Sequence, residues 1–183
     1  MTVERGERMA LVGPNGSGKT TILRCIAGTL TPSGGTVRIG GHRAGSMQAR
    51  RLVGFSMSQE RSFYLRLSGR ANLLLFATLR HDTVTAARKN VEALEEELEL
   101  REIAPERVDR CSTGMVQQLA FARSLLGEPE ALLLDEPTRS LDKDAAGRLW
   151  AAVERRERLA VLVATHLDQD VARCGRRLDV GTT

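Results

Sequence analysis

Short apolar runs alternate along the chain with segments in which apolar residues recur every three or four positions. The apolar runs predict strands at 9–12, 36–39, 52–57, 131–134 and 161–165, with a candidate last strand at 177–180. The helical spacing predicts helices at 19–27, 71–79, 87–98, 115–126 and 144–157. This alternation is typical of an α/β domain, in which a mostly parallel sheet is flanked by helices.

The stretch 65–127 breaks the alternation, because it contains helical patterns without an apolar strand between them. Ala87, Val91, Leu94 and Leu98 recur at helical spacing, and glutamates surround them. We interpret the glutamates as a solvated helix face, with a patch that docks a partner as the alternative. The pattern predicts a helical subdomain inserted into the α/β core at about 65–127.

Length and composition narrow the class of protein. The 183 residues suit one domain spanning 1–183, with 42% hydrophobic and 27% charged residues arguing against disorder. The net charge is +4, but the arginines are scattered, so we expect no nucleic-acid partner. Cys25, Cys111 and Cys174 form no CxxC pair, which disfavours a structural zinc site. No apolar stretch approaches the ~20 residues that cross a bilayer and 1–7 is charged, so we expect an intracellular protein.

The strongest motif lies between the first predicted strand and the first predicted helix, and it fits G-x-x-x-x-G-K-[ST]. Glycines let successive backbone N–H groups turn inward toward a phosphate, and the helix start adds its positive dipole end. Lys19 supplies a movable charge for the β- and γ-phosphates, and Thr20 a hydroxyl for Mg²⁺. The motif predicts a P-loop NTPase core with a phosphate-binding set consisting of Gly13, Pro14, Asn15, Gly16, Ser17, Gly18, Lys19, Thr20 and Thr21.

Two carboxylates follow a later apolar strand, at 131–134. A strand that ends in an acid delivers it to the carboxyl edge of the sheet, where open α/β sheets bind ligands. We expect Asp135 to hold Mg²⁺ through its water shell. Glu136, one residue on, faces a different way and is the candidate that polarises the attacking water.

With these motifs in place, the chain resembles the nucleotide-binding subunit of an ATP-binding-cassette (ABC) transporter from about residue 6 to residue 171. Cys111-Ser112-Thr113-Gly114-Met115 resembles the signature motif, usually written LSGGQ, and departs from it at Thr113 and Met115. The resemblance implies that Ser112 and Gly114 contact the phosphates of ATP, while a plain helix cap by Ser112 is the alternative.

Three further positions match family motifs in the family's order. Gln59 resembles the Q-loop glutamine, which in the family touches Mg²⁺ and the attacking water. Ser140-Leu141-Asp142 resembles the D-loop, which implies that Asp142 lies at the interface between two cassettes. His166 resembles the switch histidine, which contacts the γ-phosphate. The resemblance thus implies ATP hydrolysis with Mg²⁺ and a catalytic set of Glu136, His166 and Gln59.

The family also implies partners and a place in the cell. We expect a transmembrane permease subunit and a second ABC ATPase chain, identical or different, with this chain peripheral on the cytoplasmic face of the membrane. The segment that begins Glu60-Arg61-Ser62-Phe63-Tyr64 resembles exporters of lipids, polysaccharides or drugs. In such families this neighbourhood packs on a coupling helix of the permease, and local packing inside the helical insertion is the alternative.

The ends of the chain differ from the family pattern. No Tyr, Phe or Trp precedes Gly13 to stack on adenine, so we expect a domain shortened at both ends and weak discrimination between ATP and GTP. Other functions stay open: a non-transport ABC ATPase acting on ribosomes or DNA, or a regulatory module with weak or no turnover. A small-molecule P-loop kinase is a further alternative, disfavoured by the signature motif and the Asp-Glu pair.

Overall fold

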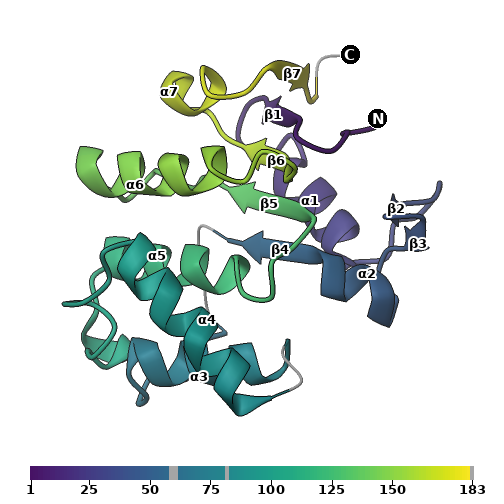
Figure 1. Cartoon of the computed structure of the whole chain (residues 1–183). Coiled ribbons are helices and arrows are strands. Elements are labelled where there is room, and N and C mark those ends of the chain that lie inside the picture. Colours follow the sequence, from purple (N-terminus) through teal and green to yellow (C-terminus); the bar gives the residue numbers. More distant parts are fainter. Residues whose placement is uncertain (58–61, 81–82, 182–183) are drawn as a thin grey trace.

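The computed structural model describes residues 1–57, 62–80 and 83–181. A five-stranded, all-parallel sheet has the order β4-β5-β6-β1-β7 (Figure 1). Its members are β1 (Arg8–Val12), β4 (Val53–Ser56), β5 (Ala131–Asp135), β6 (Ala160–Ala164) and β7 (Arg176–Asp179). The predicted α/β fold with a mostly parallel sheet is therefore confirmed.

Helices cover both faces of this sheet (Figure 1). α1 (Lys19–Ala27) and α2 (Met47–Leu52) pack on one face, where Met9, Leu133 and Leu162 contribute to a shared apolar cluster. α5 (Thr113–Ser124) and α6 (Lys143–Glu154) cover the other face, against Leu132, Leu134, Val161 and Val163. Successive strand residues point to opposite faces, which explains why the central strands are apolar throughout.

The inserted segment contains α3 (Gly69–Thr78), α4 (Val84–Glu97) and the short 3₁₀ helix η1 (Val108–Arg110) before α5. Its expected apolar stripe is buried: Ala87, Val91, Leu94 and Leu98 are each at most 3% exposed. These residues share one hydrophobic cluster with α6 and the sheet. The helical insertion is therefore packed continuously onto the α/β core.

Two sequence-based expectations need correction. The strand expected at 36–39 is only Arg38–Ile39 (β2), which pairs with β3 (His42–Arg43) in a separate two-stranded sheet. Leu52, expected in a strand, ends α2 instead, because Ser46 caps a helix there by accepting a hydrogen bond from the Ala49 N–H. The small helix α7 (Asp168–Val171) was also not predicted, and it leads from β6 to β7. None of the helices in the described residues combines the length and the apolar character needed to cross a membrane.

Candidate active site

The phosphate loop connects β1 to α1 at the carboxyl edge of the sheet, and its glycines are needed for different reasons. Gly16 and Gly18 have φ values of 84° and 97°, which side chains rarely adopt. A Cβ on Gly13 would lie 2.3 Å from the carbonyl oxygen of Val180. Gly18 is also the N-cap of α1 and provides no side-chain hydrogen bond to its first turn. The first turn of α1 is thus left available to a ligand.

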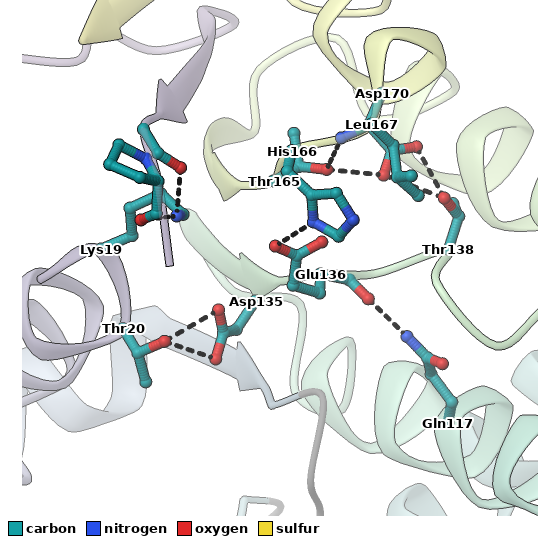
Figure 2. A network of polar contacts seen from close by, with 12 residues as sticks. Lys19, Thr20, Gln117, Asp135, Glu136, Thr138, Thr165, His166, Leu167 and Asp170 are labelled. Carbon is teal, nitrogen blue, oxygen red and sulfur yellow. Dashed lines mark hydrogen bonds and ion pairs between the residues drawn. The ribbon is translucent and has the colours of Figure 1, made fainter. Parts of the chain in front are cut away.

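Lys19 and Ser17 are the two polar side chains of this loop that are suited to bind an anion. Lys19 is 7% exposed, and its Nζ donates to the carbonyl oxygens of Gly13 and Pro14 at 2.7 and 3.1 Å (Figure 2). Ser17 Oγ is one of the few buried side-chain atoms in the described residues that has no hydrogen-bond partner. A buried cation and an unpartnered hydroxyl on one loop fit the oxygens of a phosphate chain.

Thr20 and Asp135 meet across the site. The hydroxyl of Thr20 donates to the carboxylate of Asp135, with oxygen–oxygen distances of 3.0 and 3.1 Å. Burial raises the pKa of Asp135 above its ordinary value, and the hydrogen bond from Thr20 opposes this. Hard oxygen ligands of this kind suit Mg²⁺, which keeps several waters and phosphate oxygens in its shell, so the pair fits the metal without a larger carboxylate cluster. Thr21 lies exposed beside them on the first turn of α1.

Glu136 points away from Asp135 and toward His166, as Figure 2 shows. The Nδ1 atom of His166 lies 2.8 Å from Oε1 of Glu136. Oε2 of Glu136 is buried and, among the described residues, has no hydrogen-bond partner. His166 follows β6 and Glu136 follows β5, so adjacent parallel strands place the two side chains together. One carboxylate oxygen thus contacts the histidine, while the other is left without a hydrogen-bond partner among the described residues.

A buried polar cluster supports the loops that carry Glu136 and His166. Asp170 on α7 is fully buried and accepts hydrogen bonds from Thr138, Trp150 and Thr165. Burial raises the pKa of Asp170, while these hydrogen bonds favour its charged form. The cluster fixes the loop after Glu136 to the strand end that precedes His166.

Sequence reasoning missed Gln117 as part of the site. Its buried side chain donates from Nε2 to the backbone carbonyl oxygens of Glu136 and Pro137, both at 2.7 Å. Its Oε1 accepts from the N–H of Ser140 at 3.3 Å. A single glutamine, here the fifth residue of α5, carries no pattern of its own, so the sequence offered only its place two residues after the signature-like motif.

Ser112, Gly114 and Asp142 lie at the starts of α5 and α6, the helices that cover the sheet face opposite α1. Ser112 caps α5 by accepting from the Met115 N–H at 3.2 Å, and Asp142 caps α6 by accepting from Ala145 N–H at 2.8 Å. A Cβ on Gly114 would lie 2.6 Å from the carbonyl oxygen of Ser140. Each residue thus has a structural role, and contact of these three with ATP stays a prediction. Gln59 lies outside the described residues.

The aromatic pair after the expected Q-loop divides into two environments. Phe63 is 6% exposed, packs edge-to-face on Phe76, and lies under the guanidinium of Arg123 at 5.0 Å. Tyr64 is 57% exposed and is followed by exposed Leu65. Local packing therefore accounts for Phe63, whereas Tyr64 faces outward.

Comparison with known proteins places this arrangement in a family. The family model for the ABC transporter matches residues 1–139. The ABC transporter ATP-binding protein NatA of Bacillus subtilis is 31% identical over 93% of this chain and 71% of its own length. The Nod factor export ATP-binding protein I of Neorhizobium galegae is 35% identical over 97% of this chain, which spans about half (52%) of that protein.

The fold matches solved structures as well. A dimeric ATP-binding cassette in a post-hydrolysis state, bound to ADP and Pi, superimposes with a TM-score of 0.86 at 23% identity, covering 98% of this chain and 83% of that one. The family model, the relatives and the shared fold agree on the class of protein to which the chain belongs. The chain therefore belongs to the ABC transporter family, and it is an ATPase of the ATP-binding-cassette type.

Proposed function

We propose that this chain binds Mg·ATP at the carboxyl edge of its sheet and hydrolyses it to power an exporter-type ABC transporter. The observation that carries the proposal is the convergence of Lys19, Thr20, Asp135, Glu136 and His166 at that edge (Figure 2). These groups divide into a cation, a metal-binding pair, and a carboxylate–histidine pair. That division matches the needs of phosphoryl transfer to water.

Each group has a separate task in this proposal. Lys19 and the N–H groups of the loop bind the β- and γ-phosphates, and Thr20 with Asp135 would hold Mg²⁺, which neutralises phosphate charge. Oε2 of Glu136 accepts a hydrogen bond from the attacking water and orients it toward the γ-phosphate. His166, held through Nδ1 by Glu136, presents Nε2 to the γ-phosphate. Gln59 is proposed to assist at the metal and the water.

The working unit in this proposal is a head-to-tail pair of cassettes. Ser112 and Gly114 lie at the start of α5, which covers the sheet face opposite α1 and Lys19, so in this proposal they serve the nucleotide bound by a second chain. Asp142 follows the same loop and belongs to the seam between the chains. Two ATP molecules then lie between two phosphate loops and two signature motifs, and hydrolysis releases the contact.

We further propose a permease as partner, contacted through an exposed apolar surface, with the chain on the cytoplasmic face of the membrane. The surface consists of Tyr64, Leu65 and Leu67, which are 57%, 58% and 41% exposed on the loop before α3. Exposed large apolar side chains that gather in one loop are typical of protein contacts. Export rather than import is supported by the exporter-like sequence of this region and by the Nod factor export relative.

The test is phosphate release from ATP with and without a reconstituted permease partner. We expect Mg-dependent release that the permease stimulates. Tyr64→Ser with Leu65→Ser should remove the stimulation and leave basal release unchanged. The control Leu79→Ser changes an even more exposed leucine, at the C-cap of α3, and should leave both the stimulation and basal release at the parent level. Absence of release under both conditions would favour a regulatory module. Stimulation by ribosomes instead of the permease would favour a non-transport ATPase.

A further inference from the structure

We infer that Gln117 is a positioning residue for ATP hydrolysis, which holds the carboxylate of Glu136 in place through the backbone of the loop behind it. The inference rests on the proposed role of Glu136 at the attacking water. It adds a residue from α5, the helix that starts at the signature-like motif, to the machinery of the same chain's own hydrolysis site.

The loop needs such support because of its backbone conformation. Glu136 has a φ of 50°, in the left-handed region that a residue with a side chain occupies only at a free-energy cost. This conformation turns the chain out of β5 and aims the carboxylate at His166, away from Asp135 (Figure 2). A strained residue stays in place only when its surroundings hold it, so the contacts of the loop decide where the carboxylate lies.

Those contacts come from two sides. On the sheet side, the N–H of Glu136 donates to the carbonyl oxygen of Ala164 at 2.8 Å, and Thr138 donates to Asp170. On the helix side, the carbonyl oxygens of Glu136 and Pro137 both accept from the Gln117 amide, which in turn accepts from the Ser140 N–H. One buried side chain thus binds three backbone groups within five residues of the loop.

Glutamine is suited to this task by its chemistry and its length. Its amide offers two N–H donors and one acceptor oxygen in one plane, which matches two carbonyl oxygens and one N–H. The carbonyl oxygens of Glu136 and Pro137 are bound in a buried setting, where a backbone group is costly to leave unpaired. The fit also fixes the orientation of the amide, because a reversed amide would place its oxygen against two carbonyl oxygens.

A second close contact links α5 to the loop. Gly114, in the first turn of α5, lies so close to Ser140 that a Cβ would come within 2.6 Å of its carbonyl oxygen. The Gln117 hydrogen bonds and this contact join the loop to the helix start that carries Ser112. A displacement of that helix start when it meets a partner's nucleotide therefore reaches Glu136 through Gln117.

The experiment compares Gln117→Met and Gln117→Glu with the parent chain. Met keeps the length and loses all three hydrogen bonds, while Glu keeps the shape and an acceptor for Ser140 but loses donors to Glu136 and Pro137. We expect kcat to fall roughly 10- to 100-fold in both, as displacement of a reacting group by about 1 Å does. The Kd for Mg·ATP should stay within about twofold, because the phosphate loop is untouched.

The matched control is Gln118→Met, which removes the neighbouring glutamine of the same helix and should leave kcat unchanged. The decisive measurement is a double-mutant cycle: Gln117→Met added to Glu136→Gln should not slow single-turnover hydrolysis further, because Gln117 acts through Glu136. A purely structural role would slow both backgrounds alike and would overturn the inference.

Three other results are equally decisive. Parent-like kcat in both Gln117 variants, with Glu136→Gln slow, overturns the inference and leaves the proposed function standing. A fall in kcat for Gln117→Met alone, with reduced melting temperature and a parent-like Gln117→Glu, assigns Gln117 to folding and overturns it as well. Parent-rate hydrolysis by Glu136→Gln overturns both the inference and the proposed role of Glu136.

Discussion

Two helix starts flank the loop of Glu136, and they are built in opposite ways. α1 begins after Gly18, which has a φ of 97° and gives no side-chain cap to the first turn. α5 begins after Ser112, whose hydroxyl accepts from the N–H of Met115 at 3.2 Å. Lys19 at the first start is buried, whereas Ser112 at the second is exposed. The first turn of α1 thus has backbone N–H groups without a side-chain cap, whereas in α5 the hydroxyl of Ser112 already pairs one backbone N–H group.

This difference between the starts of α1 and α5 indicates how two chains would share one ATP molecule. An uncapped helix start with a buried lysine forms an anion site within a single chain, and its donors are paired when phosphate binds. A self-capped, exposed helix start is stable without a ligand and has donors to offer only to a group brought by another molecule. We therefore expect α1 to determine affinity for ATP in the isolated chain, and α5 to determine closure of the dimer.

The largest effect is expected at Glu136. Its carboxylate would act beside the γ-phosphate that α1 of one chain and α5 of the partner chain would both contact. Glu136→Gln keeps the shape of the side chain and removes its basicity, so hydrolysis should slow about 10²- to 10⁴-fold, as loss of a general base does. Binding of Mg·ATP should persist, because Lys19 and Thr20 are unchanged. Phosphate release and size-exclusion chromatography with Mg·ATP measure the two expected outcomes, slow turnover and a trapped dimer.

The control for this variant is Glu154→Gln on α6, whose carboxylate pairs with Arg173 at the surface and should leave turnover at the parent rate. A Glu136→Gln chain that stays monomeric with its permease present would contradict the head-to-tail arrangement.

The next effect tests α1 alone. Lys19→Ala removes the buried ammonium, and charge-assisted hydrogen bonds contribute about 1.5–3 kcal/mol each, so we expect affinity for Mg·ATP to fall at least ~100-fold when two are lost. Titration calorimetry on the isolated chain measures this. Lys143→Ala is the matched control, because Lys143 is also the first residue of a helix but lies exposed on α6. Equal affinities in the two variants would remove the phosphate loop from the proposal.

The sequence was sufficient to predict α1 and the phosphate loop, but not the contacts that α5 makes with the loop of Glu136. Glycine and lysine at fixed spacing between an apolar strand and a helix determine the phosphate loop locally, so 19–27 was predicted with the bounds that the structure shows. The parallel strands were predicted for the same reason, since apolar runs such as 131–134 carry their own signal. Contacts between segments distant in sequence, such as Gln117 with Glu136, leave no local pattern.

Short elements were missed for a related reason. α2 and α7 have six and four residues, too few for helical periodicity to show. Ser46 caps α2, and α7 is held by the hydrogen bonds that buried Asp170 accepts from Thr138, Trp150 and Thr165. The left-handed backbone of Glu136 was equally hidden, because Glu has no preference for it and only the surrounding loop imposes it. Local chemistry was thus predictable, and its tertiary support was not.

A smaller effect separates the two roles of Ser112, the cap of α5 and the proposed contact with the ATP of a partner chain. Ser112→Asp in the Glu136→Gln background keeps a strong helix cap, because Asp caps as well as Ser does. The added negative charge would repel the γ-phosphate of the partner's ATP, so the trapped dimer should dissociate at least ~10-fold more readily while the melting temperature stays unchanged. Analytical ultracentrifugation with Mg·ATP measures the dimer. A dimer of unchanged affinity would assign Ser112 to capping alone.

The smallest effect concerns the cap itself, in the chain without nucleotide. Ser112→Ala removes the hydrogen bond to the Met115 N–H and should lower the free energy of unfolding by about 0.5–2 kcal/mol, the usual value of an N-cap. Ser68→Ala is the matched control, because Ser68 caps α3 in the same way, accepting from the Ala71 N–H at 3.1 Å. Urea denaturation should show similar losses in the two variants, since the caps are alike.

In the Glu136→Gln background, however, only Ser112→Ala should also weaken the Mg·ATP-dependent dimer, because only that hydroxyl would face a phosphate. Equal dimer affinities in the two alanine variants would mean that the start of α5 contributes to folding and not to closure, and the contrast between the two helix starts would then be one of stability alone.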